Sequence, residues 1–194
     1  MARSTAKTRR RILDAAYVLF RRKGFTRANV DEIAAAAEIT KRTLYSHFRS
    51  KDALLAAVLE SQHDLAFDAF QTFGKKLPGA PAEMIQAFFD ELSALSARPR
   101  WAGSGFTRLV MELADLPGHP ARAIAKRHKA ILEGHLANLL EQAGVASAKD
   151  RAREVWLLSE GAMVLVLIHG DRSYIRTAAE AAQRLLAGRP KRRA

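Results

Sequence analysis

Cysteine is absent from the sequence, which excludes disulfide bonds, thiolate metal sites and cysteine nucleophiles together. Glycine and proline are sparse as well, with 11 and 6 residues in a chain of 194, and no low-complexity tract indicates disorder. Hydrophobic residues make up 48% of the chain, enough for the cores of one or two domains. The absence of cysteine is also compatible with a reducing cytoplasm, where we expect the protein to reside.

Long uninterrupted hydrophobic runs are also missing. Residues 12–20, ILDAAYVLF, follow a basic start as in a signal peptide, but Asp14 interrupts them and no small-residue cleavage site follows. Residues 155–170 are interrupted by Ser159 and Glu160 and are fewer than the ~20 residues that span a bilayer. We therefore expect no signal peptide, no membrane-spanning helix and no membrane partner.

Positive charge is concentrated at the two ends of the chain. Residues 1–51 hold 13 Lys and Arg against four Asp and Glu, a net charge of +9, and residues 189–194 hold four against none. The whole chain carries +12, so the residues between these segments sum to −1. A basic N-terminal module on an almost neutral body suits a polyanion such as nucleic acid. The alternative is that the charge only keeps a solvated surface soluble.

No segment shows the alternating pattern of a strand, so the sequence predicts an all-α fold of about nine helices. The first is expected at about 7–23, closed by Gly24 in a left-handed conformation. The second opens at Asn29, with Glu32 as its capping-box partner, and has an inner face of Ile33, Ala34 and Ala37. The third runs from Thr40 to about Arg49.

Ser50 is expected to cap a longer fourth helix that joins the basic module to the body. Its inward side would carry Leu54, Leu55, Val58, Leu65 and Phe70. Further helices are predicted at about 82–97, 104–115, 120–143, 148–169 and 172–187. Gly144 and Gly188 are the expected stops of two of them, and Ser147 with Asp150, and Asp171, are the expected starts of the last two.

The stretch TKRTLYSHFRSKDALL, residues 40–55, combines an apolar edge with a basic one. Leu44 and Phe48 lie one helical turn apart and should face inward. The outward edge near the helix N-terminus then carries Lys41, Arg42, Tyr45 and Ser46. With the preceding helix and a tight turn at Glu38 and Ile39, this pattern is typical of a helix-turn-helix, which directs such an edge at bases in the major groove.

Residues 24–55 resemble the N-terminal DNA-binding signature of the TetR family of transcriptional regulators. The matching positions are Gly24, Phe25, Ile33, Ala34, Leu44, Tyr45, His47, Phe48, Ser50 and Lys51. One departure is Glu38, where the family often has glycine in the turn. A non-glycine residue at positive φ costs roughly 1 kcal/mol or a little more, and a carboxylate there would repel phosphate unless it points away.

The resemblance implies a DNA-binding set of Thr26, Arg27, Thr40, Lys41, Arg42, Thr43, Tyr45, His47 and Lys51. Within it, Lys41, Arg42 and Thr43 would face bases, while Thr26, Thr40, Tyr45, His47 and Lys51 would chiefly hold phosphates. Tyr45 and His47 could instead be packing residues with a solvated tip. The arginines at positions 3 and 9–11 lie along DNA as an arm or are simply solvated.

The resemblance also implies a helical body that binds a ligand and dimerises, giving domains at 1–50 and 51–188 and a basic tail at 189–194. In the segment 153–170, apolar residues lie on nearly every side, so the helix needs more cover than one neighbouring layer. The expected dimer interface comprises Val155, Leu158, Ala162, Val166, Ile175, Ala178, Ala182 and Leu185. The alternative is that these residues form only intramolecular core.

A small-molecule sensor would line an apolar pocket with aromatic residues and a few polar contacts. The candidates are Phe67, Phe70, Phe88, Trp101, Phe106, Arg108, Met111, His128, His135 and Trp156. His128 and His135 are seven residues apart, but no third ligand accompanies them at metal spacing, so we expect neither a metal nor a cofactor.

The resulting expectation is a ligand-responsive regulator, most simply a repressor, that binds a palindromic operator in double-stranded DNA as a homodimer and is released by a small, largely apolar effector. One alternative is a dimeric DNA-binding regulator without an effector. The other is a hydrolase that uses Ser104 in WAGSGF, but the nucleophile-elbow pattern needs glycine where Ala102 and Phe106 stand. We therefore expect that the protein is not an enzyme.

Overall fold

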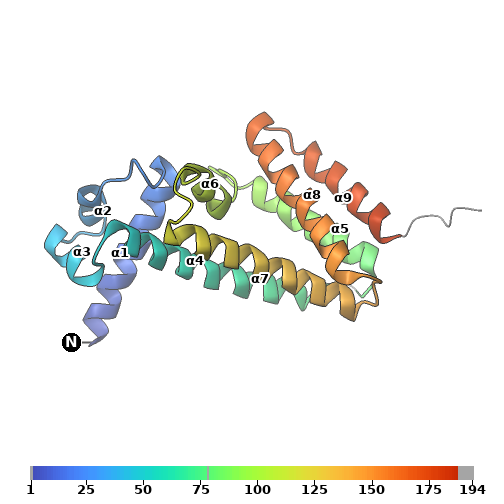
Figure 1. Cartoon of the computed structure of the whole chain (residues 1–194), viewed down its shortest axis with the longest axis horizontal. Coiled ribbons are helices and arrows are strands. Elements are labelled where there is room, and N and C mark those ends of the chain that lie inside the picture. Colours follow the sequence, from blue (N-terminus) through green and yellow to red (C-terminus); the bar gives the residue numbers. More distant parts are fainter. Residues whose placement is uncertain (1, 78, 188–194) are drawn as a thin grey trace, which may run out of the picture. The chain divides into compact units, whose positions relative to one another are not determined.

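The computed structural model describes residues 2–77 and 79–187, and within these ranges the chain forms nine helices and no strand (Figure 1). This confirms the predicted all-α class. The helices are α1 (Ala2–Lys23), α2 (Val30–Ala36), α3 (Lys41–His47), α4 (Lys51–Gly74), α5 (Pro81–Ser96), α6 (Gly105–Glu112), α7 (Pro120–Gln142), α8 (Ala148–His169) and α9 (Ser173–Leu186). The basic tail at 189–194 and the expected stop at Gly188 lie outside the described residues.

The chain divides into two compact units. Unit 1 comprises the residues up to Phe67 together with Gly105–His128, and unit 2 comprises Asp68–Ser104 together with the residues from Lys129 onward. Helices α4 and α7 therefore each contribute residues to both units. The domain boundary predicted between residues 50 and 51 is a functional division, and it stays a prediction.

Two apolar clusters form the core of unit 1. The first joins α1, α2, α3 and the start of α4 through Ile12, Leu13, Ala16, Val30, Ile33, Ala34, Ala37, Leu44, Phe48, Leu54 and Val58. The second joins the loop after α1 to α4, α6 and α7 through Phe25, Leu55, Leu59, Phe106, Leu109, Leu113, Ala121 and Ala125. The predicted inner faces of the second and third helices are thus confirmed.

Most of the predicted helix boundaries carry the expected capping groups. Gly24 has φ +86° after the end of α1, and the side chain of Asn29 accepts a hydrogen bond from the backbone N–H of Asp31 at 2.9 Å. The Thr40 hydroxyl accepts from Thr43 N–H at 3.1 Å, and the Ser50 hydroxyl accepts from Ala53 N–H at 3.0 Å. These side chains satisfy backbone donors that a helix N-terminus leaves open.

Three local expectations were wrong. Helix α1 begins at Ala2 rather than near Lys7. Leu65 was placed on the inward side of α4, yet half of its surface is exposed (50%). Ser147 makes no side-chain cap for α8, because it adopts a left-handed conformation with φ 55° and only its carbonyl accepts bonds, from the N–H groups of Asp150 and Arg151.

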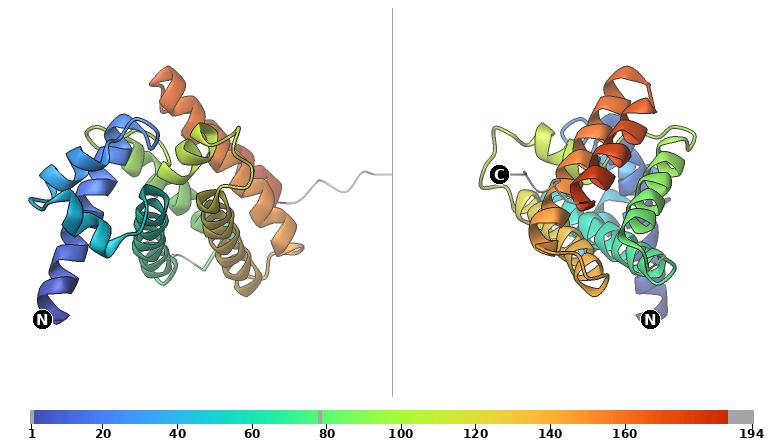
Figure 2. Two further views of the ribbon diagram at one scale, coloured as in Figure 1. Left: turned by 60° about the vertical axis from the view of Figure 1, so that its left-hand side comes forward. Right: turned by 90° about the vertical axis from the view of Figure 1, so that its right-hand side faces the viewer.

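Unit 2 is built around α8, which packs against α5 and α9 (Figures 1 and 2). Six of the eight residues expected at a dimer interface fill this core, with exposures of 6% or less: Val155, Ala162, Val166, Ile175, Ala178 and Ala182. Their side chains pack against helices of the same protomer, and their part in a dimer interface stays a prediction. Leu158 and Leu185 are half-buried.

The opposite side of α8 carries a different apolar stripe. Leu157 and Ile168 are 68% and 65% exposed, Leu165 is 36% exposed, and Gly161 between them is exposed as well. Their spacing of four, four and three residues places them on one helix face. We call these four residues the α8 stripe.

The burial of Ile175 leads to the first prediction. Ile175→Ala should lower the free energy of unfolding by about 2–5 kcal/mol, because it leaves a cavity in a packed core. Urea denaturation followed by circular dichroism measures this loss. The control Leu116→Ala removes a side chain that is 52% exposed and should change stability by no more than about 0.5 kcal/mol. Equal losses in both variants would contradict the assigned burial.

Candidate nucleic-acid interface

Helix α3 has one buried edge and one exposed edge, as expected. Leu44 and Phe48 are 0% and 5% exposed in the first cluster of unit 1. Lys41, Arg42 and Tyr45 lie on the exposed edge, with Tyr45 43% exposed. A helix whose inner edge is packed in the core and whose outer edge is exposed to solvent has the geometry of a helix-turn-helix recognition element.

The turn between α2 and α3 is a regular helix stop despite its glutamate. Glu38 has φ 51°, the positive value expected from the family's glycine at this place. Its N–H donates to the Ala35 carbonyl and that of Ile39 donates to the Ala34 carbonyl, both at 3.0 Å, which is the bonding of a Schellman motif. Glu38 therefore leaves the turn geometry intact.

Arg11 of α1 compensates for the unusual residue in this turn. Its guanidinium donates to the carbonyl of Ala37 at 2.5 Å and to the Glu38 carboxylate at 2.8 Å. The Glu38 side chain is thereby turned toward α1, although it remains 84% exposed. A cation at a helix C-terminus also interacts favourably with the helix dipole. The negative charge of Glu38, which the sequence predicts to repel DNA phosphates, is thus paired with Arg11 within the protein.

All four acidic residues among positions 1–51 are paired with basic ones. Besides Arg11–Glu38, the pairs are Arg10–Asp14 within α1, Lys23–Glu32 between α1 and α2, and Lys41–Asp31 between α2 and α3. The hydrogen bond from Lys23 is the main reason why the pKa of Glu32 lies below its ordinary value. Three of the pairs join separate elements, so the acids connect the module's helices.

The other predicted DNA contacts occupy varied surroundings. Arg27 and Arg42 are exposed, and Thr43 and His47 are half-buried. The Thr40 hydroxyl lies 2.9 Å from that of Thr43 and serves as the α3 cap. Arg9 lies over the ring of Phe48, with its guanidinium carbon 5.1 Å from the centroid. Arg9, Arg10 and Arg11 are therefore engaged with the module itself in this conformation.

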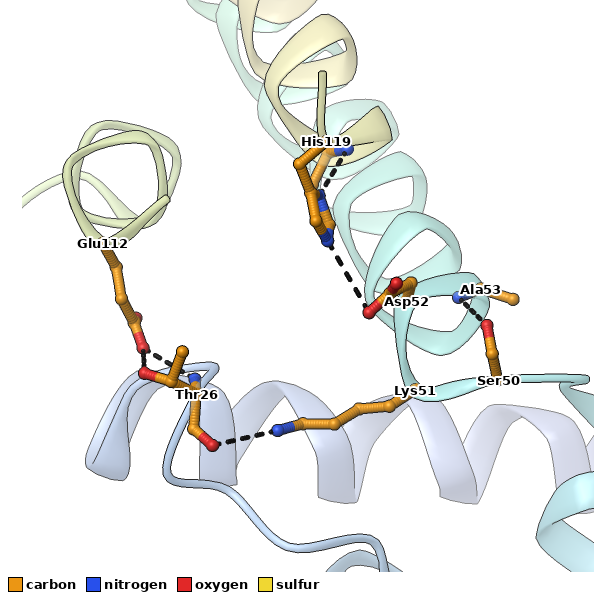
Figure 3. A network of polar contacts seen from close by, with 8 residues as sticks. Thr26, Ser50, Lys51, Asp52, Ala53, Glu112 and His119 are labelled. Carbon is orange, nitrogen blue, oxygen red and sulfur yellow. Dashed lines mark hydrogen bonds and ion pairs between the residues drawn. The ribbon is translucent and has the colours of Figure 1, made fainter. Parts of the chain in front are cut away.

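Thr26 and Lys51 belong to a polar network that extends to α6 (Figure 3). The Glu112 carboxylate accepts hydrogen bonds from the Phe25 N–H at 2.9 Å, from the Thr26 N–H at 2.6 Å and from the Thr26 hydroxyl. Lys51 donates to the Thr26 carbonyl at 3.2 Å. Both donors of Thr26 are thus engaged by Glu112, which does not fit its predicted role as a phosphate contact.

The electrostatics of this network follow from partial burial and neighbouring charges. Burial acts to raise the pKa of the Glu112 carboxyl, but the hydrogen bonds from Thr26 and Phe25 and the charge of Arg108 hold it below its ordinary value. Burial lowers the pKa of Lys51, against the opposing effect of the Glu112 and Asp52 charges. Asp52 also lies 3.6 Å from Nε2 of His119 (Figure 3).

Glu112 was not predicted from the sequence. Its partners lie 86 and 87 positions away, and no local motif connects them. Arg108 was predicted as a ligand contact, yet its guanidinium donates to the carbonyl of Arg21 at 3.2 Å in the last turn of α1. Both α6 residues therefore attach this helix to the corner between α1 and α2.

Five of the predicted ligand contacts lie in unit 1, but only some of them lie near one another. The His128 ring, 4% exposed, stacks on Phe106 with centroids 3.7 Å apart. Its Nδ1 lies 2.8 Å from Nδ1 of His63, whose ring stacks on Phe67 at 5.8 Å. Arg108 binds α1, and Met111 is 61% exposed. Met111 therefore does not lie among the interior aromatic rings.

The other five predicted ligand contacts lie in unit 2. Phe70 contacts the rings of Phe88 and His135 at centroid distances of 6.1 and 5.5 Å, and Phe88 contacts Trp156 at 6.5 Å. Trp101 also packs against the unit 2 core. Lys129 lies 5.8 Å from the Trp156 ring centroid and 3.3 Å from the hydroxyl of Ser104, and it is ion-paired with Glu160 at 2.5 Å.

The described residues contain no group of three or more His, Asp or Glu side chains arranged to hold a metal ion. In the same part of the chain, no helix combines the length and the apolar character that crossing a bilayer requires.

Residues 12–58 match the sequence profile described as bacterial regulatory proteins, tetR family. The HTH-type transcriptional regulator SrpR of Pseudomonas putida is 45% identical over 73 residues, which are 35% of this chain and 34% of SrpR. The chain thus aligns with only about a third of the length of this curated relative. The profile match, over residues 12–58, covers the helix-turn-helix region.

Solved structures are similar over nearly the whole chain. SCO4454, a TetR-family transcriptional regulator from Streptomyces coelicolor, has a TM-score of 0.84 and 25% identity, covering 94% of this chain and 97% of its own. A candidate TetR-type regulator from Streptomyces avermitilis has a TM-score of 0.73 and 31% identity, covering 90% and 97%.

The bonds from Arg11 to the turn lead to a second prediction. Arg11→Ala should lower the free energy of unfolding by about 1 kcal/mol, because it removes a charged donor from the end of α2. The matched control Glu38→Gln removes only the exposed ion pair and should change stability by less than about 0.5 kcal/mol. Differential scanning fluorimetry and urea titration compare the two, and a larger loss in Glu38→Gln would contradict the assignment.

Proposed function

Because the chain belongs to the TetR family and is a DNA-binding transcriptional regulator, we propose that it binds an inverted-repeat operator as a homodimer and represses transcription there. The observation that carries this proposal is the exposed edge of α3 on a firmly packed module. In bacteria such a protein acts in the cytoplasm, where the DNA lies.

Base reading is assigned to the N-terminal half of α3. Arg42 is exposed there and can donate two hydrogen bonds to guanine O6 and N7. Lys41 can do so after exchanging its partner Asp31 for a base, and Thr43 can read either kind of base. Tyr45, His47, Thr40 and Lys51 position the protein on phosphates.

Dimerisation is proposed through the α8 stripe rather than through the residues first expected. One short recognition helix reads few base pairs, and a two-fold dimer doubles the site. Leu157, Gly161, Leu165 and Ile168 supply apolar surface that a soluble protomer would otherwise leave in water, and the glycine allows a second helix to approach closely. Half-buried Leu158 and Leu185 are proposed to border this interface.

A small, largely apolar effector is proposed to release the protein from DNA. Support comes from the buried ring of Phe88 and the partly buried rings of Phe70 and Trp156 in unit 2, with His135 against Phe70. An effector can shift affinity only by binding the DNA-bound and released conformations differently. A hydrolase based on Ser104 has less support, because the nearby Lys129 is ion-paired with Glu160 and so does not act as its base.

Selection of binding sites from random duplexes tests the DNA-binding proposal. The purified protein should enrich one inverted repeat, and Arg42→Ala carried through the same selection should lose preference at one position of each half-site. The control Arg22→Ala removes an exposed arginine of α1 that is not among the predicted DNA contacts, and it should enrich the same sequence. If the wild-type protein enriched no inverted repeat, the operator proposal would be wrong.

The α8 stripe leads to a further prediction. The double variant Leu157→Glu, Ile168→Glu should weaken dimerisation by more than about a hundredfold, because each protomer would bury two unpaired charges. Sedimentation velocity measures the association, and circular dichroism should show an unchanged helix content, since both positions are exposed in the protomer. A double variant that still sediments as a dimer would contradict this interface.

A further inference from the structure

Helix α6 reaches the corner between α1 and α2 with two side chains. Arg108 and Glu112 are four residues apart, so they project from the same side of the helix. Arg108 donates to the Arg21 carbonyl before the corner, and Glu112 accepts from Phe25 and Thr26 after it. Both ends of the corner are therefore attached to α6.

The corner is shaped around the Glu112 carboxylate. Gly24 has φ +86°, and a Cβ atom at this position would lie 3.0 and 3.1 Å from the two carboxylate oxygens. Two successive backbone N–H groups after such a residue form a concavity that favours an anion. Here the anion is supplied by the protein itself, and the Thr26 hydroxyl adds a third donor to it.

The opposite side of the Thr26 residue is bound by Lys51. The ammonium group donates to the Thr26 carbonyl at 3.2 Å and lies 4.5 Å from the centre of the Phe25 ring. Lys51 is the first residue of α4, directly after the cap that follows α3. A continuous path of hydrogen bonds thus leads from Glu112 through Thr26 to Lys51 (Figure 3).

We propose that Glu112 is a positioning residue for DNA binding, which acts by holding Thr26 so that its carbonyl directs the Lys51 ammonium toward a phosphate. This inference rests on the proposed phosphate contact of Lys51. One hydrogen bond to Thr26 leaves Lys51 two further donors for the DNA backbone. Glu112 itself touches no DNA in this scheme, and it lies far outside the helix-turn-helix in the sequence.

The role of Glu112 is separable from folding. Leu109 of α6 and Leu113, which directly follows this helix, are buried with Phe25 and Leu55 in the second cluster of unit 1. This apolar contact remains when only the carboxylate changes. Glu112→Gln keeps the size of the side chain but offers one acceptor oxygen and an NH2 group, which cannot satisfy the two backbone N–H groups and the hydroxyl as a carboxylate does.

The direction of the change in DNA affinity separates a positioning role of Glu112 from a simple effect of its charge. Removing a negative charge should by itself strengthen binding to DNA. We expect Glu112→Gln instead to weaken binding about fivefold, because Lys51 loses its fixed direction. Fluorescence anisotropy on a labelled random-sequence duplex measures the affinity, since a phosphate contact acts on any sequence. The control Asp115→Asn removes an exposed charge just beyond α6 and should leave the affinity equal or slightly higher.

A double-mutant cycle identifies the route. Lys51→Ala alone should lower the affinity for DNA relative to the wild-type protein. Adding Glu112→Gln to Lys51→Ala should then lower this affinity no further. A purely structural role of Glu112 would weaken both backgrounds equally and would overturn the inference. Thr26→Val, which removes only the hydroxyl, should weaken binding by a smaller factor than Glu112→Gln and gives a second measure if Glu112→Gln folds poorly.

The outcomes distinguish this inference from the proposal on which it rests. An unchanged affinity in Lys51→Ala would overturn the phosphate contact, and the inference with it. A weakened Lys51→Ala together with full affinity in both Glu112→Gln and Thr26→Val would overturn the inference alone. Enrichment of an inverted repeat is independent of both results, because base contacts at Arg42 do not pass through Thr26.

Discussion

The burial of Leu44 and Phe48 is the constraint on which the interface depends. A helix of seven residues such as α3 is too short to persist by itself in water. It exists because these two side chains complete a core made by α1, α2 and the start of α4. The same contact fixes which edge faces outward, so the direction of Lys41 and Arg42 is a consequence of apolar packing and not of their charge.

Local signals made much of this fold predictable. Gly24, Asn29, Thr40 and Ser50 mark helix ends through their own backbone chemistry, which depends only on nearby residues. The positive φ of Glu38 was predictable for a similar reason, since a Schellman stop requires it whichever residue is present. The start of α1 was missed because no capping residue marks Ala2.

Features that depend on distant partners were not predictable. Glu112 stands in a short amphipathic helix with no sign that two amides 86 and 87 positions away require an acceptor. In α8, apolar residues occur on nearly every side, so periodicity could not separate core residues such as Val155 from exposed ones such as Leu157. Residue type alone supports the ligand candidates in the sequence, and the fold places five of them in each unit. The base and phosphate roles within α3 stay predictions.

The pairing of all four acids in the first 51 residues has a consequence for thermodynamics in salt solutions. A lysine or arginine that already holds a carboxylate can neutralise a phosphate only by giving up that partner, so it releases fewer of the cations condensed on a nucleic acid. The steepness with which affinity falls with ionic strength then reflects fewer cations than the 13 Lys and Arg of residues 1–51. Added ions would also loosen the three pairs that join separate elements, so the module's internal cohesion and its hold on DNA weaken together.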